Sequence, residues 1–187
     1  EDDFFVRNII GHTRYSTNTY KNNLENFQPL IGKHLKLGEF SMVHNGNIPF
    51  QKLSNKSDTY ILLEFIQNSK KNSFFEILED LLKTIKGIYC LAILDNNNNI
   101  FVCRDTTGNR PLFIGTKSSL CQCRNCSCDS SICISSDSSS FLDNYNFERE
   151  IDCGEILKIK NGKILLKKNI LLNKKNILSN KKFFCIF

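Results

Sequence analysis

The chain has 187 residues, of which 41% are hydrophobic, and a formal net charge of +6. This length and apolar content allow one domain with a substantial core and argue against two domains. The basic excess is concentrated in residues 158–182, where lysine alternates with asparagine and leucine and no basic motif interleaved with aromatic residues occurs. We therefore expect a solvated basic face and no nucleic-acid partner.

The cysteines and the apolar runs indicate the cellular compartment in which the protein is expected. Five of the nine cysteines lie between Cys121 and Cys133 instead of forming an evenly spread disulfide framework, which favours a reducing compartment, the cytoplasm. No apolar run approaches the length that spans a membrane, and no signal peptide is recognisable. The chain begins with Glu1 and its only methionine is Met42, so we expect an N-terminus that was processed or cut.

The first segment is apolar over residues 4–10 and predicts a strand or a strand-like entry. It is followed directly by a polar cluster, residues 11–19. Such a cluster is typical of a surface loop, in which Arg14 would be a solvated charge. The functional alternative is that Arg14 binds a carboxylate with both branches of its guanidinium, while the Ser16 and Thr17 hydroxyls complete the recognition.

The central stretch is an apolar strand, residues 40–44, that ends in Asn45-Gly46. Asn-Gly is the strongest short signal for a β-hairpin turn, in which Gly46 would supply a positive φ. A strand that ends in Asn-Gly can also present a side-chain amide and a backbone N–H to one point, which is the geometry of an oxyanion hole. The residues alone leave both interpretations open.

Two amphipathic helices are predicted next. The first begins with Ser57 at the N-cap and Asp58 in the first turn, where a carboxylate interacts favourably with the helix dipole without any ligand. The second has the capping box Ser73 with Glu76. Each helix carries one apolar stripe and should cover one face of a sheet.

The second half of the chain predicts strands. They lie at residues 88–94 and 100–103, 112–115 and 132–135, and 155–159 and 163–166, with a short helix within 136–142. Asn161-Gly162 is a type I′ hairpin signal. Two arginines, Arg104 and Arg110, surround Asp105 and predict a structural salt-bridge network. The order of elements predicts an α+β fold with antiparallel sheets.

Taken in order, the motifs resemble the glutaminase domain of class II glutamine amidotransferases, in the N-terminal nucleophile hydrolase superfamily, and within that class the amidophosphoribosyltransferases. The matching pieces span nearly the whole chain. They are residues 11–17, Asn26 with Gln28-Pro29, residues 44–47, residues 57–59, Arg104-Asp105 with Gly108, residues 110–112, residues 154–156 and residues 184–187.

The resemblance implies a four-layer αββα sandwich of antiparallel sheets and assigns roles to the site residues. Arg14 would hold the α-carboxylate of glutamine, and Asp58 its α-ammonium. Asn45 and the N–H of Gly46 would stabilise the tetrahedral oxyanion that forms when the amide is attacked. Two further residues, Tyr15 and Thr17, would line the same pocket.

The chain departs from the family pattern at its start. The family's nucleophile is an N-terminal cysteine whose own α-amino group acts as the base, and none of the nine cysteines stands in its place. We therefore expect residues 1–187 to be a glutaminase domain truncated at both ends, without glutaminase activity by itself. Tyr60, Thr106 and Asn109 also replace residues that are usual in the family.

The resemblance also implies partners and cofactors. In amidophosphoribosyltransferases a second domain binds phosphoribosyl pyrophosphate and magnesium, and the complete enzyme is expected to be a homo-oligomer. Some members hold an iron–sulfur cluster, and Cys185 matches one of its four cysteine ligands. We expect no cofactor in this chain alone. The cysteine-rich insertion, residues 121–133, lacks the two separated knuckles of a structural zinc site, so exposed free thiols are the preferred interpretation.

Three rival interpretations remain from the residues. One is a glutamate synthase type of domain, which the run Ser16-Thr17-Asn18-Thr19 resembles. Another is a glucosamine-6-phosphate synthase type, which usually has tryptophan where Tyr15 stands. The third is a paralogue that binds glutamine without a nucleophile to attack it.

Overall fold

The computed structural model describes residues 7–13, 27–49, 57–117, 131–141 and 145–172. In chain order, the elements are β1 (Leu30–His34), β2 (Gly38–Asn47), α1 (Asp58–Gln67), α2 (Phe74–Thr84), β3 (Ile88–Asp95), β4 (Ile100–Arg104), β5 (Phe113–Lys117), β6 (Ser131–Ser135), the 3-10 turn η2 (Ser138–Phe141), β7 (Asn146–Glu150), β8 (Glu155–Lys160) and β9 (Lys163–Asn169).

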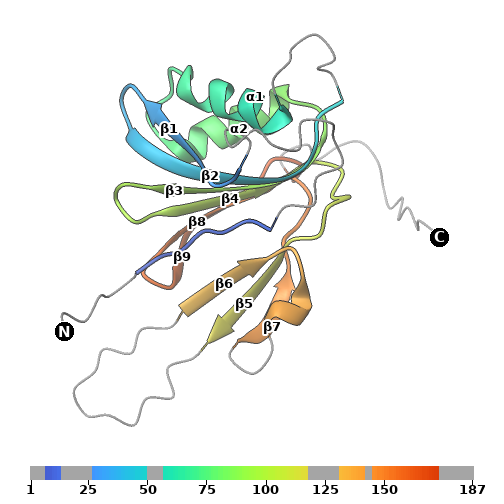
Figure 1. Ribbon diagram of the computed structural model, residues 1–187. Coiled ribbons are helices and arrows are strands. Elements are labelled where there is room, and N and C mark those ends of the chain that lie inside the picture. The colour runs from blue at the N-terminus through green and yellow to red at the C-terminus, as the bar shows by residue number, and fades with distance from the viewer. Residues whose placement is uncertain (1–6, 14–26, 50–56, 118–130, 142–144, 173–187) are drawn as a thin grey trace, which may run out of the picture.

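The strands form two antiparallel sheets. The larger has six strands in the order β1-β2-β3-β4-β8-β9, and the smaller has three in the order β6-β5-β7. Both helices cover the outer face of the larger sheet, and the smaller sheet lies against its other face (Figure 1). The α+β class with antiparallel sheets is therefore confirmed, and the described residues form three successive layers of the expected αββα order.

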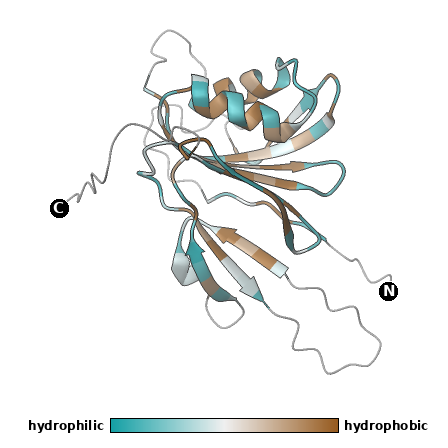
Figure 2. Cartoon of the chain, turned by 180° about the vertical axis from the view of Figure 1, so that it is seen from behind, coloured by the Kyte–Doolittle hydropathy of each residue, from teal (hydrophilic) through white to brown (hydrophobic). Residues whose placement is uncertain are grey.

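Two apolar clusters hold these layers together. The first lies between the helices and the larger sheet, and it contains the alternate β2 residues Phe40 and Met42. The second lies between the two sheets, where Cys90 and Val102 meet Ile114. Figure 2 shows apolar residues along the central strands of the larger sheet and both apolar and polar residues along the helices. No described helix is long and apolar enough to cross a membrane.

Local signals placed several elements correctly. The Ser73 hydroxyl accepts the N–H of Glu76 at 3.2 Å, as the capping box predicts. Both Asn161 and Gly162 have positive φ, 49° and 66°, as a type I′ turn between β8 and β9 requires. The expected entry strand is not observed over its described part, because residues 7–13 belong to no strand.

The corner at residues 104–111 is structural, but its salt bridge is not the one predicted. Arg104 pairs with Glu150 of β7 at 2.7 Å and donates to the carbonyl oxygens of Gly108, Arg110 and Ile151. Asp105 instead accepts the N–H groups of Tyr89 and Gly108. The predicted network is therefore wrong in its partners, because Glu150 is distant in sequence and is brought to Arg104 by the second sheet.

A buried ion pair also joins the two sheets. Glu155 of β8 is fully buried and accepts two hydrogen bonds of 2.8 Å from Arg149 of β7, with Lys167 at 3.2 Å. Burial by itself raises the pKa of Glu155, but the hydrogen bonds from Arg149 and from the Asp152 N–H outweigh it, so the pKa lies below its ordinary value. Glu155 therefore stays ionised at neutral pH.

Glu155→Gln should lower the free energy of unfolding of this chain by about 3 kcal/mol, because it leaves Arg149 in a partly buried place without its charged partner. Urea unfolding at pH 7 measures the change. The matched control is Asp80→Asn, which breaks the half-exposed pair with Lys71 and should cost less than about 1 kcal/mol. Equal losses in both variants would contradict a stabilising role for the Glu155 pair.

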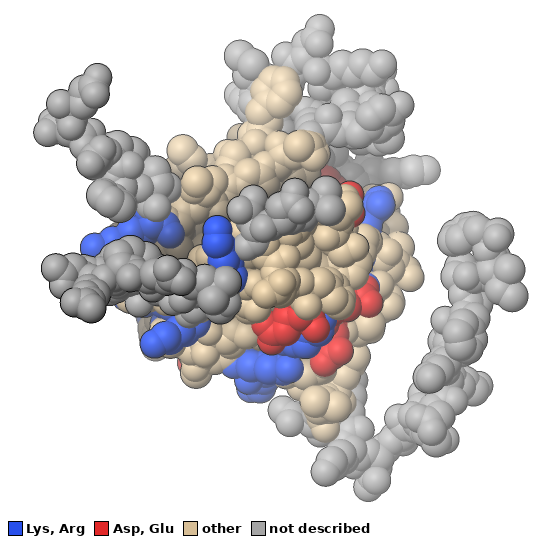
Figure 3. Space-filling view, turned by 90° about the horizontal axis from the view of Figure 1, so that it is seen from below, with Lys and Arg blue, Asp and Glu red and all other residues tan. Residues whose placement is uncertain are grey.

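The surface carries both signs of charge. On the face that Figure 3 shows, acidic side chains lie directly beside basic ones. Two of the late lysines are paired, Lys167 with Glu155 and Lys168 with Glu79 at 2.6 Å. The expectation that no nucleic acid binds stays a prediction.

Candidate functional site

The predicted turn at Asn45-Gly46 is a continuation of strand β2. Asn45 pairs with Cys90 of β3, and Gly46 pairs with Tyr89. The hairpin interpretation is therefore wrong at this position. Paired residues share a face of the sheet, so the half-buried Asn45 side chain lies on the Cys90 face, which faces the smaller sheet.

The backbone N–H and C=O groups of Gly46 point away from β3. Tyr89 donates its N–H to the Asp105 carboxylate at 3.1 Å, and its carbonyl accepts the Asp105 N–H at 2.9 Å. Both polar groups of Tyr89 are thus turned toward β4, so Gly46 and Tyr89 form a pair without mutual hydrogen bonds. It follows that the Gly46 N–H is directed to the opposite side of β2, past the end of β1, which pairs only with residues 38–42.

The N–H of His44 confirms this direction, because alternate residues of a strand direct their N–H groups to the same side, and the N–H of Ile48, directly after the strand, is consistent with it. The N–H of His44 donates to the Gln28 side chain at 2.5 Å, on the side of β1. The N–H of Ile48 donates to the Asp58 carboxylate at 3.3 Å. The Gly46 N–H therefore lies in one row between a side-chain amide and a carboxylate.

A glycine is required at position 46 by close packing. A Cβ built there would lie 2.0 Å from the carbonyl oxygen of Ile88 and 2.6 Å from the Cα of Tyr89. Both are backbone atoms of β3, which cannot move without disturbing the sheet. The glycine thus allows β2 and β3 to approach closely at the point where the N–H is presented.

Asp58 is the first residue of α1, as predicted. Its carboxylate accepts the N–H of Thr59 at 3.0 Å and that of Ile48. It therefore connects the helix N-terminus to the residue that follows β2. Ser57 occupies the N-cap, but its side chain makes no capping hydrogen bond, and its hydroxyl is buried without a partner among the described residues.

His44 is a buried polar residue that the sequence interpretation used only as the end of a strand. It is 3% exposed, and its Nδ1 lies 3.1 Å from the Thr59 hydroxyl. Its Nε2 has no hydrogen-bond partner within the described ranges. The signal in the sequence was present, because His44 continues the alternation of Phe40 and Met42 into the core.

Burial lowers the pKa of His44 to about 4. The negative charge of Asp58 acts in the opposite direction, while His12 and Arg110 add to the lowering. These groups therefore lie near enough to His44 to form one electrostatic environment with it. The imidazole is neutral at physiological pH.

The chain should lose stability as the pH falls from 6.5 to 4, because the unfolded chain binds a proton on His44 that the folded chain excludes. The loss from this residue should reach about 3 kcal/mol at pH 4. Urea unfolding of the chain at pH 7, 5.5 and 4.5 measures it. His44→Asn cannot titrate and should show a shallower pH dependence; an identical slope would show that His44 is protonated in the folded state.

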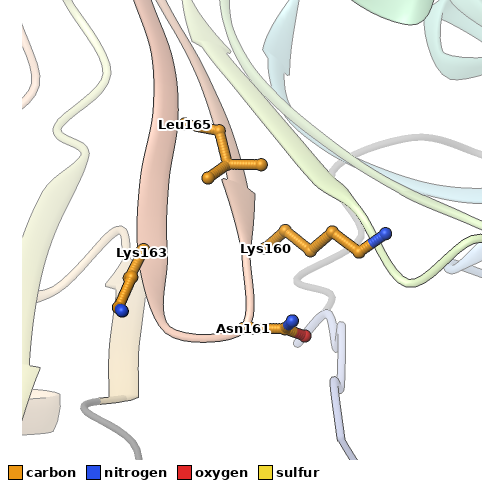
Figure 4. Close-up of a pocket in the computed structure, with 4 residues that line it drawn as sticks. All are labelled: Lys160, Asn161, Lys163 and Leu165. Carbon is orange, nitrogen blue, oxygen red and sulfur yellow. The ribbon is translucent and has the colours of Figure 1, made fainter.

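A pocket on the larger sheet lies away from these residues. It has a volume of about 240 Å³ and is lined by Lys160, Asn161, Lys163 and Leu165 at the turn between β8 and β9. The two lysine side chains point away from each other and do not converge on one ligand (Figure 4). Strands β3 and β4 separate β8 from β2, so this pocket is no part of the candidate site.

The structure thus brings Asn45, Gly46 and Asp58 to one end of β2. The other site residues expected from the sequence, Arg14, Tyr15, Thr17 and Cys185, lie outside the described residues, as do the insertion cysteines except Cys133. Cys133 is half-buried on β6, where burial raises the pKa of its thiol. Within the described ranges, no three metal-ligating side chains gather.

Three comparisons with known proteins agree on the family to which the chain is similar. A model of the glutamine amidotransferase domain matches residues 12–123. The chain is similar to amidophosphoribosyltransferase 3 of Arabidopsis thaliana chloroplasts, 31% identical over 163 residues that are 80% of this chain and 28% of the relative. It is also similar to the amidophosphoribosyltransferase of Methanocaldococcus jannaschii, 29% identical over 85% of this chain and 34% of the relative.

A solved structure shares the fold. The glutamine phosphoribosylpyrophosphate amidotransferase from B. subtilis, complexed with ADP and GMP, matches with a TM-score of 0.64 and 25% identity, over 84% of this chain and 34% of that one. The chain therefore spans about a third of the length of the relatives that it matches.

Proposed function

Because the chain belongs to the glutamine amidotransferase domain family and is homologous to amidophosphoribosyltransferases, we propose that it serves as the glutaminase domain of an enzyme that hydrolyses glutamine and delivers the ammonia to phosphoribosyl pyrophosphate. The product would be 5-phosphoribosylamine, in purine biosynthesis. The observation that carries this proposal is the row of N–H groups at the end of β2, in which the Gly46 N–H lies two residues before the Ile48 N–H that binds the Asp58 carboxylate.

The proposed reaction uses these groups in a definite order. Asp58 binds the α-ammonium of glutamine by charge, and Arg14 its α-carboxylate. The N-terminal cysteine that this family uses as nucleophile would pass its thiol proton to its own α-amino group and attack the amide carbon, and the carbonyl oxygen becomes an oxyanion that the Asn45 amide and the Gly46 N–H stabilise. The α-amino group returns that proton to the leaving nitrogen, so ammonia leaves and a thioester remains. Water then hydrolyses the thioester to glutamate and the free thiol.

The decisive experiment is a coupled assay on the complete protein with glutamine and magnesium, with and without phosphoribosyl pyrophosphate. We expect glutamate and pyrophosphate to be released in equal amounts. Glutamate release without pyrophosphate release would assign the domain to another class II amidotransferase. Binding of glutamine without any glutamate release would identify a non-catalytic paralogue.

Arg14→Lys should raise the KM for glutamine at least tenfold in the complete protein, because a point charge cannot replace the planar fork of a guanidinium on a carboxylate. Steady-state kinetics with glutamine measure the effect. The control is Arg7→Lys, which makes the same exchange at an exposed position and should leave KM unchanged. An unchanged KM in Arg14→Lys would assign Arg14 a structural role.

A further inference from the structure

The N-terminus of α1, which carries Asp58, is held to the sheet by a group of three side chains. His44 on β2, Thr59 in the first turn of α1 and Gln28 before β1 contact one another: His44 Nδ1 lies 3.1 Å from Thr59 Oγ1, and the Gln28 amide lies 3.4 Å from the same oxygen. The side-chain oxygen Oε1 of Gln28 also accepts the His44 N–H. We call these three residues the anchor.

The anchor matters for α1 because this helix lacks the usual side-chain hydrogen bond at its N-cap. Asp, Ser or Thr at an N-cap usually accepts an N–H of the first turn, but the Ser57 side chain makes no such bond. The Thr59 hydroxyl is a polar contact of the first turn with the buried His44 of β2, and Thr59 is 6% exposed. Asp58 is its immediate neighbour, so the position of the carboxylate depends on this contact.

The two ends of the site differ in how firmly they are held. Asn45 and Gly46 are part of the β2 ladder with β3. Asp58 is connected to that ladder through the N–H of Ile48, at 3.3 Å, and through the anchor. Loss of the anchor would therefore displace Asp58 and leave the strand in place.

We propose that His44 and Thr59 are positioning residues that fix Asp58 at the distance from Gly46 at which glutamine is bound, an inference that rests on the proposed function. His44 serves as a neutral imidazole whose Nδ1 is paired with the Thr59 hydroxyl. The groups that act electrostatically on it are Asp58 from α1, His12 from the N-terminal segment and Arg110 from the loop before β5. Neutrality suits the role, since a charged imidazole would compete with the ligand's ammonium for Asp58.

Thr59→Val tests the proposal, because valine has the shape of threonine without the hydroxyl. In the complete protein we expect a roughly tenfold higher KM for glutamine with kcat within about twofold, since Asp58 would bind ground state and transition state alike. Thr59→Ser retains the hydroxyl and should restore the wild-type KM. A merely structural role would lower the melting temperature of Thr59→Val and leave KM unchanged.

Gln28→Leu provides a second test if Thr59→Val fails to fold, because Gln28 is the partly exposed member of the anchor. It removes the amide that contacts Thr59 and should raise KM about threefold, again without a change in kcat. Wild-type KM in the folded variant overturns the proposal. Absence of glutamine turnover in the wild-type protein would instead overturn the proposed function, so the two failures are distinct.

Discussion

Asn45→Ala should lower kcat for glutamine hydrolysis by roughly two orders of magnitude in the complete protein, as expected when one donor of an oxyanion hole is removed. The KM for glutamine should change little, because the amide acts on a charge that exists only in the transition state. Steady-state kinetics separate the two constants. The strand should remain intact, since the Asn45 pairing with Cys90 is made by the backbone.

Two further variants make this result specific to the amide group. Asn45→Asp keeps the shape but replaces the donor by a negative charge, so it should lower kcat at least as much as alanine does. Asn47→Ala removes the next asparagine along the strand, which is exposed, and should change kcat less than about threefold. An Asn45→Ala variant with the wild-type kcat would remove this amide from the oxyanion hole.

The elements with strong local signals could be predicted from the sequence. The second helix has a capping box and an apolar stripe that recurs at helical spacing, and it was found at Phe74–Thr84. The turn at Asn161-Gly162 needs positive φ at two successive residues, which those residue types tolerate. In both cases a few neighbouring residues determine the structure.

Strand β7 could not be predicted in this way. Its sequence, Asn-Phe-Glu-Arg-Glu, has neither an alternating nor a continuous apolar pattern, and four of its five residues are exposed. It is a strand because it pairs with β5, with a register shift between Ile114 and Gly115. Tertiary pairing also overrode the local preference at Asn45-Gly46, where β3 holds the two residues in an extended strand.

The sequence could name candidate site residues, but their arrangement in space required the structure. Asp58 and Asn45 stand in recognisable motifs, but the row of N–H groups depends on which side of β2 each backbone group faces. That side can be inferred from Tyr89, whose N–H and carbonyl are both hydrogen-bonded to Asp105 and therefore do not face β2. The sequence indicated a structural corner around Asp105 but not the partners of its carboxylate, and its relation to Gly46 required the sheet register.

Gly46→Ala should have the other large effect, with a loss of at least two orders of magnitude in kcat, comparable to the loss of an oxyanion donor. The added Cβ would lie 2.0 Å from the Ile88 carbonyl oxygen, so β2 must move away from β3. That movement displaces the Gly46 N–H from the row between Gln28 and Asp58. Kinetics of the complete protein, together with its melting temperature, measure the loss of activity and the strain separately.

The control is Gly32→Ala on β1, where the added Cβ would meet side chains, Phe40 at 2.5 Å and Leu63 at 2.7 Å. Overpacking there should destabilise the protein by about 1–3 kcal/mol, yet it disturbs no backbone group of the site. We therefore expect a lower melting temperature with an unchanged kcat in Gly32→Ala, and a fall in both quantities in Gly46→Ala. If the two variants lost activity only in proportion to their loss of stability, the Gly46 N–H would have no part in the reaction and the glycine would serve strand packing alone.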